Sequence, residues 1–134
     1  MIVADTNLTF YLFVRSPITA EAEAVYRKDF EWIAPPLWRS EFRNALAFYL
    51  RRGLLALNDA VAKMRAAELI VRSRESEIAS SQVLRLATSS GCSAYDCEFV
   101  ALAQHLAVPL VTSDRQVLAK FKNTATSPRA FCSS

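Results

Sequence analysis

The stretch MIVADTN, residues 1–7, decides the fold, because an apolar run passes directly into three residues that favour the N-cap of a helix. This order predicts a short buried strand that leads into a helix. The same unit recurs along the chain: WIA at 32–34 precedes two prolines, and LVT at 110–112 precedes a serine and an aspartate. Short apolar strands that alternate with helices are typical of a parallel sheet covered on both faces.

Apolar periodicity and turn residues predict the remaining elements. We expect helices over residues 8–14, 19–30, 37–52, 58–72, 80–89, 93–106 and 115–121, and strands over 1–4, 32–34, 77–78, 110–112 and 125–126. Gly53 and Gly91 are expected to end two of the helices, and Pro109 a third. The last residues are polar and are expected to form a flexible tail. The predicted fold is an α/β/α sandwich with a short parallel sheet of four to five strands flanked by helices.

Length and composition indicate one globular domain over residues 1–134. Hydrophobic residues make up 52% of the chain and charged residues 22%, so a core can form without disulfides. The three cysteines are odd in number and form no C-x-x-C pair, which argues against a disulfide framework and a zinc ribbon. No apolar run approaches the roughly 20 residues of a membrane span, and Asp5 comes too early for a signal peptide. We therefore expect a cytoplasmic protein.

Charge and glycine content exclude some functions and leave others open. The net charge of +3 permits a nucleic-acid substrate without requiring one. With only two glycines, the chain cannot form the glycine-rich loop of a P-loop enzyme or the G-x-G-x-x-G turn of a standard Rossmann dehydrogenase.

Three aspartates follow predicted strands or open predicted helices: Asp5, Asp96 and Asp114. Ligands of open parallel sheets bind beyond the carboxyl ends of the strands, so these side chains are candidates for a site. Each has a second interpretation, because aspartate also favours helix N-caps and first turns. In particular, SAYD at 93–96 fits a capping box that would engage the third carboxylate.

Glu41 lies on the flank of an otherwise apolar helix face, between Ala45 and Phe48. This placement puts its carboxylate beside the core. The alternative is a partly buried glutamate that forms an ion pair with Arg52 or another base.

Taken together, the four carboxylates predict a metal site. Three could converge at the sheet edge, and the fourth could reach in from a neighbouring helix. Two carboxylates about 4 Å apart repel by ~4 kcal/mol at an effective dielectric constant near 20, so a cluster of four needs protons or cations. Oxygen ligands without histidine or thiol favour Mg²⁺ or Mn²⁺. Such an ion can activate water for attack on a phosphodiester bond.

Four segments in order resemble the PIN-domain family and, within it, the VapC-type toxins. They are VADTN at 3–7, PLWRSE at 36–41 with NAL at 44–46, SAYD at 93–96 with VALA at 100–103, and PLVTSD at 109–114. Together they span nearly the whole chain. Phe99 is one departure, since many relatives carry tyrosine at this position.

The resemblance implies a PIN fold, RNA cleavage, and a metal site formed by Asp5, Glu41, Asp96 and Asp114. It further implies that Thr112 supports the acidic site, that Asn7 and Asn44 are polar neighbours of the ligands, that a cognate VapB-like antitoxin wraps the protein and blocks the site, and that the protein forms a homodimer.

The remaining candidates are less specific. Arg39 and Arg43 lie one turn apart and could bind RNA phosphates or an acidic antitoxin arm, although a solvated helix face explains them equally well. His105 is expected on the surface, in the last turn of its helix.

Two alternatives to a toxin remain open. One is a housekeeping PIN nuclease without an antitoxin. The other is a non-catalytic α/β module such as a phosphoacceptor receiver domain, which would require a paired acidic cluster after the first strand and a lysine after the last strands.

Overall fold

The computed structural model describes residues 1–73 and 78–134 of the chain. Its strands form one sheet in the order β3-β2-β1-β4-β5, and every neighbouring pair is parallel. The strands are β1 (Ile2–Ala4), β2 (Trp32–Ala34), β3 (Val71–Ser73), β4 (Leu110–Val111) and β5 (Ala125–Thr126). The predicted α/β fold with a short parallel sheet is confirmed.

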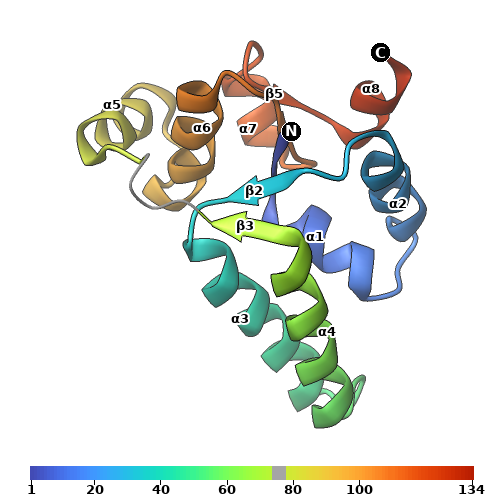
Figure 1. The fold of residues 1–134 in the computed structure, drawn as a ribbon. Coiled ribbons are helices and arrows are strands. Elements are labelled where there is room, and N and C mark those ends of the chain that lie inside the picture. The colour runs from blue at the N-terminus through green and yellow to red at the C-terminus, as the bar shows by residue number, and fades with distance from the viewer. Residues whose placement is uncertain (74–77) are drawn as a thin grey trace.

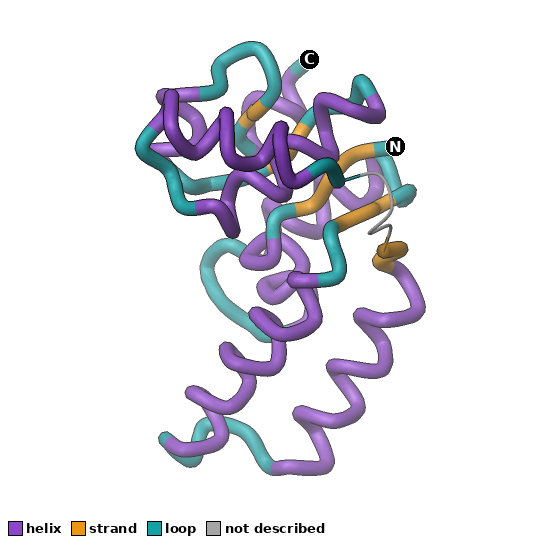
Figure 2. Tube along the Cα trace, turned by 90° about the vertical axis from the view of Figure 1, so that its left-hand side faces the viewer, coloured by secondary structure: helices purple, strands orange, loops and turns teal. Residues whose placement is uncertain are grey.

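Helices cover the sheet on both sides. Figure 1 shows α5 and α6 on one side of the sheet and α1 and α2 on the other. Helices α3 and α4 form a hairpin that extends away from the sheet, as Figures 1 and 2 both show. Among the described residues, no helix is both long and apolar enough to cross a membrane. The helices are α1 (Thr6–Phe13), α2 (Thr19–Lys28), α3 (Leu37–Arg51), α4 (Leu57–Ile70), α5 (Ser80–Ser90), α6 (Ala94–Leu106), α7 (Arg115–Lys120) and α8 (Pro128–Ser133).

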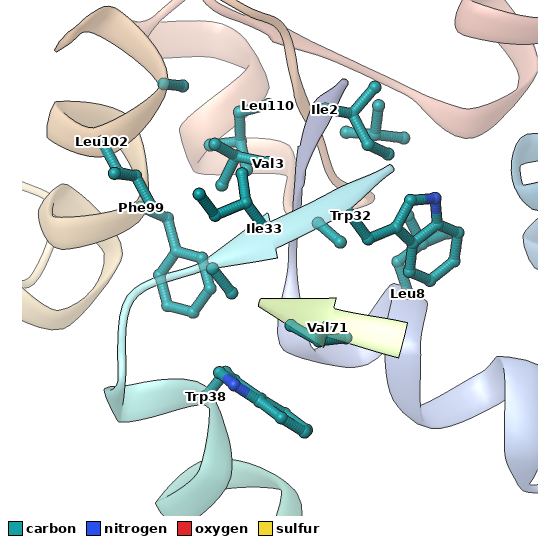
Figure 3. Close-up of a cluster of buried hydrophobic side chains, with 14 of the residues drawn as sticks. Ile2, Val3, Leu8, Trp32, Ile33, Trp38, Val71, Phe99, Leu102 and Leu110 are labelled. Carbon is teal, nitrogen blue, oxygen red and sulfur yellow. The ribbon is translucent and has the colours of Figure 1, made fainter. Parts of the chain in front are cut away.

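The core forms where the central strands meet the helices (Figure 3). Val3 of β1 pairs with Ile33 of β2 and Leu110 of β4, and all three side chains are buried. Helix α6 adds Phe99 and Leu102 from one side. Burial of one such side chain contributes about 1.5–3 kcal/mol relative to exposure, so the central strands are firmly anchored.

Aromatic side chains join α1 to α3. The ring of Phe10 packs edge-on against Phe42 and Tyr49, with centroids 5.3 and 5.4 Å apart. Trp38 packs against Phe42 in turn. The aromatic residues of these two helices therefore lie mostly in or against the core, and they set the position of the helix that carries Glu41.

The prediction of a strand at 77–78 is wrong. Glu77 lies outside the described residues, and Ile78 is not in a strand. The third strand is instead β3, which follows α4 directly and pairs with β2. Its residues Arg72 and Ser73 are exposed at the edge of the sheet, so the segment lacks the apolar pattern of a buried strand.

The carboxyl end also differs from expectation, because helix α8 forms where the sequence predicts a polar tail. Ser127 caps this helix through a hydrogen bond from the Ala130 N–H, and a proline occupies its first turn. Lys28 of α2 donates to the carbonyl oxygens of Phe131 and Ser134. An N-cap serine followed by proline is a helix-start signal that the sequence interpretation overlooked.

Candidate active site

The topology brings three of the four predicted acidic residues to the carboxyl edge of the sheet. Asp5 follows β1 and Asp114 follows β4, and these strands are neighbours. Helix α6 precedes β4 and must run back across the sheet, so its first turn, with Asp96, lies at the same edge. These three aspartates line one small depression together with Phe99 and Thr112.

Asp5 is held by a hydroxyl group from the neighbouring strand connection. Its Oδ2 accepts a hydrogen bond from Thr112 Oγ1 at 2.9 Å, and Thr112 Oγ1 in turn accepts from the Asp114 N–H at 3.0 Å. Although Asp5 occupies the N-cap position of α1, its side chain makes no capping hydrogen bond. Capping therefore does not explain this carboxylate, and Thr112 lies where the resemblance implies.

Glu41 reaches the same region from the second turn of α3. Its Oε1 accepts a hydrogen bond from Thr6 Oγ1 at 2.7 Å. The alternative of an ion pair with Arg52 is wrong, because that guanidinium lies over the ring of Phe48, 3.9 Å from its centroid. Thr6 belongs to the first strand–helix junction, but the sequence interpretation assigned it no part in the site.

Asp96 and Asp114 are fixed mainly by their own helices. The Asp96 N–H donates to Ser93 Oγ at 3.0 Å, which forms half of the predicted capping box and involves the backbone of Asp96. Asp114 Oδ1 accepts from the Val117 N–H at 2.9 Å and caps α7. Both capping interpretations are thus partly correct, and neither occupies every carboxylate oxygen.

Burial and mutual repulsion raise the pKa values of three carboxyl groups. The pKa of Asp5 is raised from 3.8 to about 6, chiefly by burial and also by the charges of Glu41 and Asp96, while the hydrogen bonds from Thr112 and the Thr6 backbone oppose the shift. Burial also raises the pKa of Glu41, with a contribution from Asp96. The pKa of Asp96 is raised by burial and by Asp114. The four acidic groups therefore form one electrostatic cluster.

The donor set fits a hard divalent cation in its chemistry, since carboxylate oxygens converge on one edge. Among the described residues, however, no three histidine, cysteine, aspartate or glutamate side chains form a group that could hold a metal ion between them. Mg²⁺ commonly keeps several waters and uses one or two carboxylates together with substrate phosphates. The arrangement therefore suits a hydrated ion better than a closed cage of four protein ligands.

The other predicted residues make no hydrogen bond or ion pair to the acidic cluster within the described part of the chain. Asn7 and Asn44 are exposed, and neither contacts the acidic groups through a hydrogen bond within the described part of the chain. Arg39 forms an ion pair with Glu68 of α4 at 2.7 Å, so part of its charge is used within the protein. Arg43 is exposed and forms no ion pair with the described residues.

Phe99 and His105 both lie on α6. Phe99 is buried and its ring borders the acidic depression, so this side of the depression is apolar. His105 is exposed in the last turn of α6, as predicted, and is distant in sequence from the acidic first turn.

Comparison with known proteins agrees with this fold. The family model of the PIN domain matches residues 2–125. The chain belongs to the PIN domain family. PIN domains are in general nucleases that act on RNA and typically use divalent metal ions. No curated protein matches the chain significantly.

A solved structure has a fold similar to that of this chain. The crystal structure of PAE2754 from Pyrobaculum aerophilum is similar to this chain, with a TM-score of 0.78 and 22% sequence identity. The match covers 98% of this chain and 86% of the other. At 22% sequence identity, this similarity shows that the two proteins share a fold.

Proposed function

We propose that this protein is a Mg²⁺- or Mn²⁺-dependent endoribonuclease and the toxin component of a VapBC-like toxin–antitoxin module. The observation that carries the proposal is the cluster formed by Asp5, Glu41, Asp96 and Asp114 at one edge of the sheet, with raised pKa values for the first three. Carboxylates that repel one another in a partly buried site are stabilised by cations at neutral pH.

The four acidic residues would hold a hydrated ion, in part through its water molecules, and when bound the ion supplies a more acidic water molecule and neutralises charge on the scissile phosphate. Thr112 keeps Asp5 oriented, because its hydroxyl donates to one carboxylate oxygen and leaves the other available. Asp96 is only partly buried, so its carboxylate can reach a bound substrate.

Substrate binding outside the acidic cluster is assigned to α3. Arg43 is exposed two residues after Glu41 and is suited to contact an RNA phosphate. Arg39 is a weaker candidate, because RNA must compete with Glu68 for its guanidinium. Replacement of Arg43 by glutamine is therefore expected to weaken RNA binding more than the same change at Arg39.

The toxin assignment rests on the resemblance of the four segments to VapC-type toxins, and implies action in the cytoplasm, a VapB-like antitoxin and a homodimer. Exposed apolar residues near the tip of the α3–α4 hairpin, Phe48, Leu54 and Leu57, are suited to contact another protein. A PIN nuclease without an antitoxin is the alternative. A small antitoxin reading frame beside the gene favours the toxin, and its absence favours the alternative.

Purified protein provides the first test. We expect RNA cleavage with Mg²⁺ or Mn²⁺, none with EDTA, and none by Asp96→Asn. Asp59→Asn is the matched control, because Asp59 is an exposed aspartate in the first turn of α4, away from the cluster. Full metal-dependent activity of Asp96→Asn would refute the proposed site.

Expression in bacteria tests the toxin role. Growth arrest with discrete new RNA ends is expected from the unmutated protein and not from Asp96→Asn. The unmutated protein could instead cleave RNA in vitro but leave growth and RNA ends in the cell unchanged. This result would support the nuclease activity and refute the toxin role.

A further inference from the structure

Thr6 lies at the junction between the two halves of the acidic cluster. It is the first residue of α1 and is 6% exposed. Its neighbour Asp5 accepts a hydrogen bond from Thr112, which follows β4, whereas Thr6 donates to Glu41 on α3, which follows β2. Because β1 lies between β2 and β4, two consecutive residues connect the segments that follow both neighbouring strands.

The hydroxyl of Thr6 makes a contact that a helix start does not require. Threonine at a helix terminus commonly bonds to backbone groups a few residues away. The hydrogen bond of Thr6 reaches a side chain 35 positions along the chain. A hydroxyl can donate only one hydrogen bond, and the Thr6 hydroxyl donates it to Glu41. This contact therefore acts on the carboxylate of the site and not on the helix end.

The Thr6 side chain fixes the direction of this hydrogen bond more firmly than a flexible donor could. Its β-branched side chain is stiff at χ1, and burial removes alternative orientations. Glu41, by contrast, has three rotatable side-chain bonds and is only partly buried. Anchoring Oε1 restricts these rotations and leaves Oε2 available to a ligand.

Aromatic contacts between α1 and α3 help to maintain the hydrogen bond between Thr6 and Glu41. Phe10, one turn after Thr6, packs against Phe42, the residue that follows Glu41. Phe10 also packs against Tyr49 two turns further along α3. The aromatic contacts therefore keep α1 and α3 in a register that places the hydroxyl beside the carboxylate.

We infer that Thr6 is a positioning residue of the active site, whose buried hydroxyl orients Glu41 beside Asp5 and thereby sets the affinity for the divalent ion. This inference rests on the proposed function. The junction between β1 and α1 then contributes two residues to the site: Asp5 as a ligand and Thr6 as the residue that orients Glu41.

Two substitutions separate the hydroxyl from the packing. Thr6→Val keeps the shape and removes the donor, and Thr6→Ser keeps the donor and removes the methyl group. Calorimetric titration with Mn²⁺ is expected to give a Kd about ten- to a hundredfold higher for Thr6→Val and close to the unmutated value for Thr6→Ser. RNA cleavage should follow the same order, with kcat reduced more than KM is raised.

Two outcomes would overturn the assignment. Thr6→Val could bind Mn²⁺ as tightly as the unmutated protein, which would show that the hydroxyl is dispensable. Thr6→Ser could be as weak as Thr6→Val, which would assign the effect to packing of the methyl group. Thermal unfolding of both variants checks that each is folded before titration.

Failure of the inference is distinguishable from failure of the proposed function. If the unmutated protein neither binds Mn²⁺ nor cleaves RNA, the metal-dependent nuclease fails and the link from Thr6 to ion affinity fails with it. If the unmutated protein does both and Thr6→Val is unchanged, only the Thr6 assignment fails. A crystal structure of Thr6→Val with Glu41 in its original orientation would also overturn it.

Discussion

The acidic cluster contains two pairs of carboxylates that are held in different ways. Asp5 and Glu41, the deep pair, accept hydrogen bonds from threonine hydroxyls 107 and 35 positions away in the sequence. Asp96 and Asp114, the rim pair, belong to helix starts whose capping hydrogen bonds span three residues. Local capping can place the rim pair wherever its helices begin, whereas only tertiary packing can place the deep pair.

The largest expected difference between the pairs is in activity, between Asp5 of the deep pair and Asp114 of the rim pair. Asp5→Asn should reduce metal-dependent RNA cleavage on the order of a thousandfold, because it removes a negative charge from the least solvated part of the cluster. Asp114 is exposed, so Asp114→Asn should reduce cleavage less, on the order of tenfold. Single-turnover rates at saturating Mn²⁺ measure both effects. Equal losses would show that depth in the site has no influence.

The second prediction concerns stability without metal. The pKa of Asp5 is raised from 3.8 to about 6, so the folded protein binds a proton more tightly than the unfolded chain. The free energy of unfolding should therefore decrease as pH rises from about 3 to 7, by about 3 kcal/mol from this group. Urea unfolding with EDTA at several pH values measures the decrease.

Asp5→Asn provides the control for this pH dependence. The variant should be more stable than the unmutated protein at pH 7, with a smaller decrease that remains from Glu41 and Asp96, whose pKa values are also raised. Asp59→Asn should retain the full decrease. An unmutated protein whose stability rises over this pH range would contradict the assignment of Asp5 as a partly buried carboxylate that is destabilised when charged.

The third prediction concerns the hydroxyl that holds Asp5. Thr112→Val should weaken Mn²⁺ binding about ten- to a hundredfold, because it removes the donor to Asp5 and the acceptor of the Asp114 N–H. Thr112→Ser, which keeps the hydroxyl, should recover most of the affinity. Calorimetric titration compares the two variants. Equal affinities would show that the Thr112 hydroxyl does not influence ion binding by the deep pair.

The smallest effect is expected at the rim. Ser93→Ala removes the N-cap of α6 and should reduce the free energy of unfolding by about 1 kcal/mol. Cleavage should change only a few-fold, since the Asp96 carboxylate itself remains. Urea unfolding and cleavage assays on the same preparation test this. A loss of activity as large as that of Asp5→Asn would show that local capping, too, is essential for the site.

Sequence reasoning identified the site residues with unequal success. Asp114 and Asp96 stand beside recognisable strand and capping signals, and the structure brings them to one depression with Asp5. Thr6 lies in the same segment as Asp5, yet its role depends on Glu41, which is remote in sequence. No local pattern distinguishes a threonine that points to a distant carboxylate from one that caps its own helix.

The strands also differ in whether a local sequence pattern predicts them. Strands β1, β2 and β4 are apolar runs and were predicted, whereas β3 was not, because Arg72 and Ser73 are exposed. Pairing with β2 is what makes residues 71–73 a strand. The interaction of Lys28 with α8 likewise joins residues more than 100 positions apart.

By itself, the sequence determined the α/β class, the central strands and the local position of the three aspartates after a strand or at a helix start. These features follow from hydrophobic periodicity and capping, which act over a few residues. Only the tertiary structure decided that the Thr6 hydroxyl holds Glu41 and that residues 71–73 form β3. Those features depend on contacts between distant segments, whose geometry exists only once the core has packed around β1.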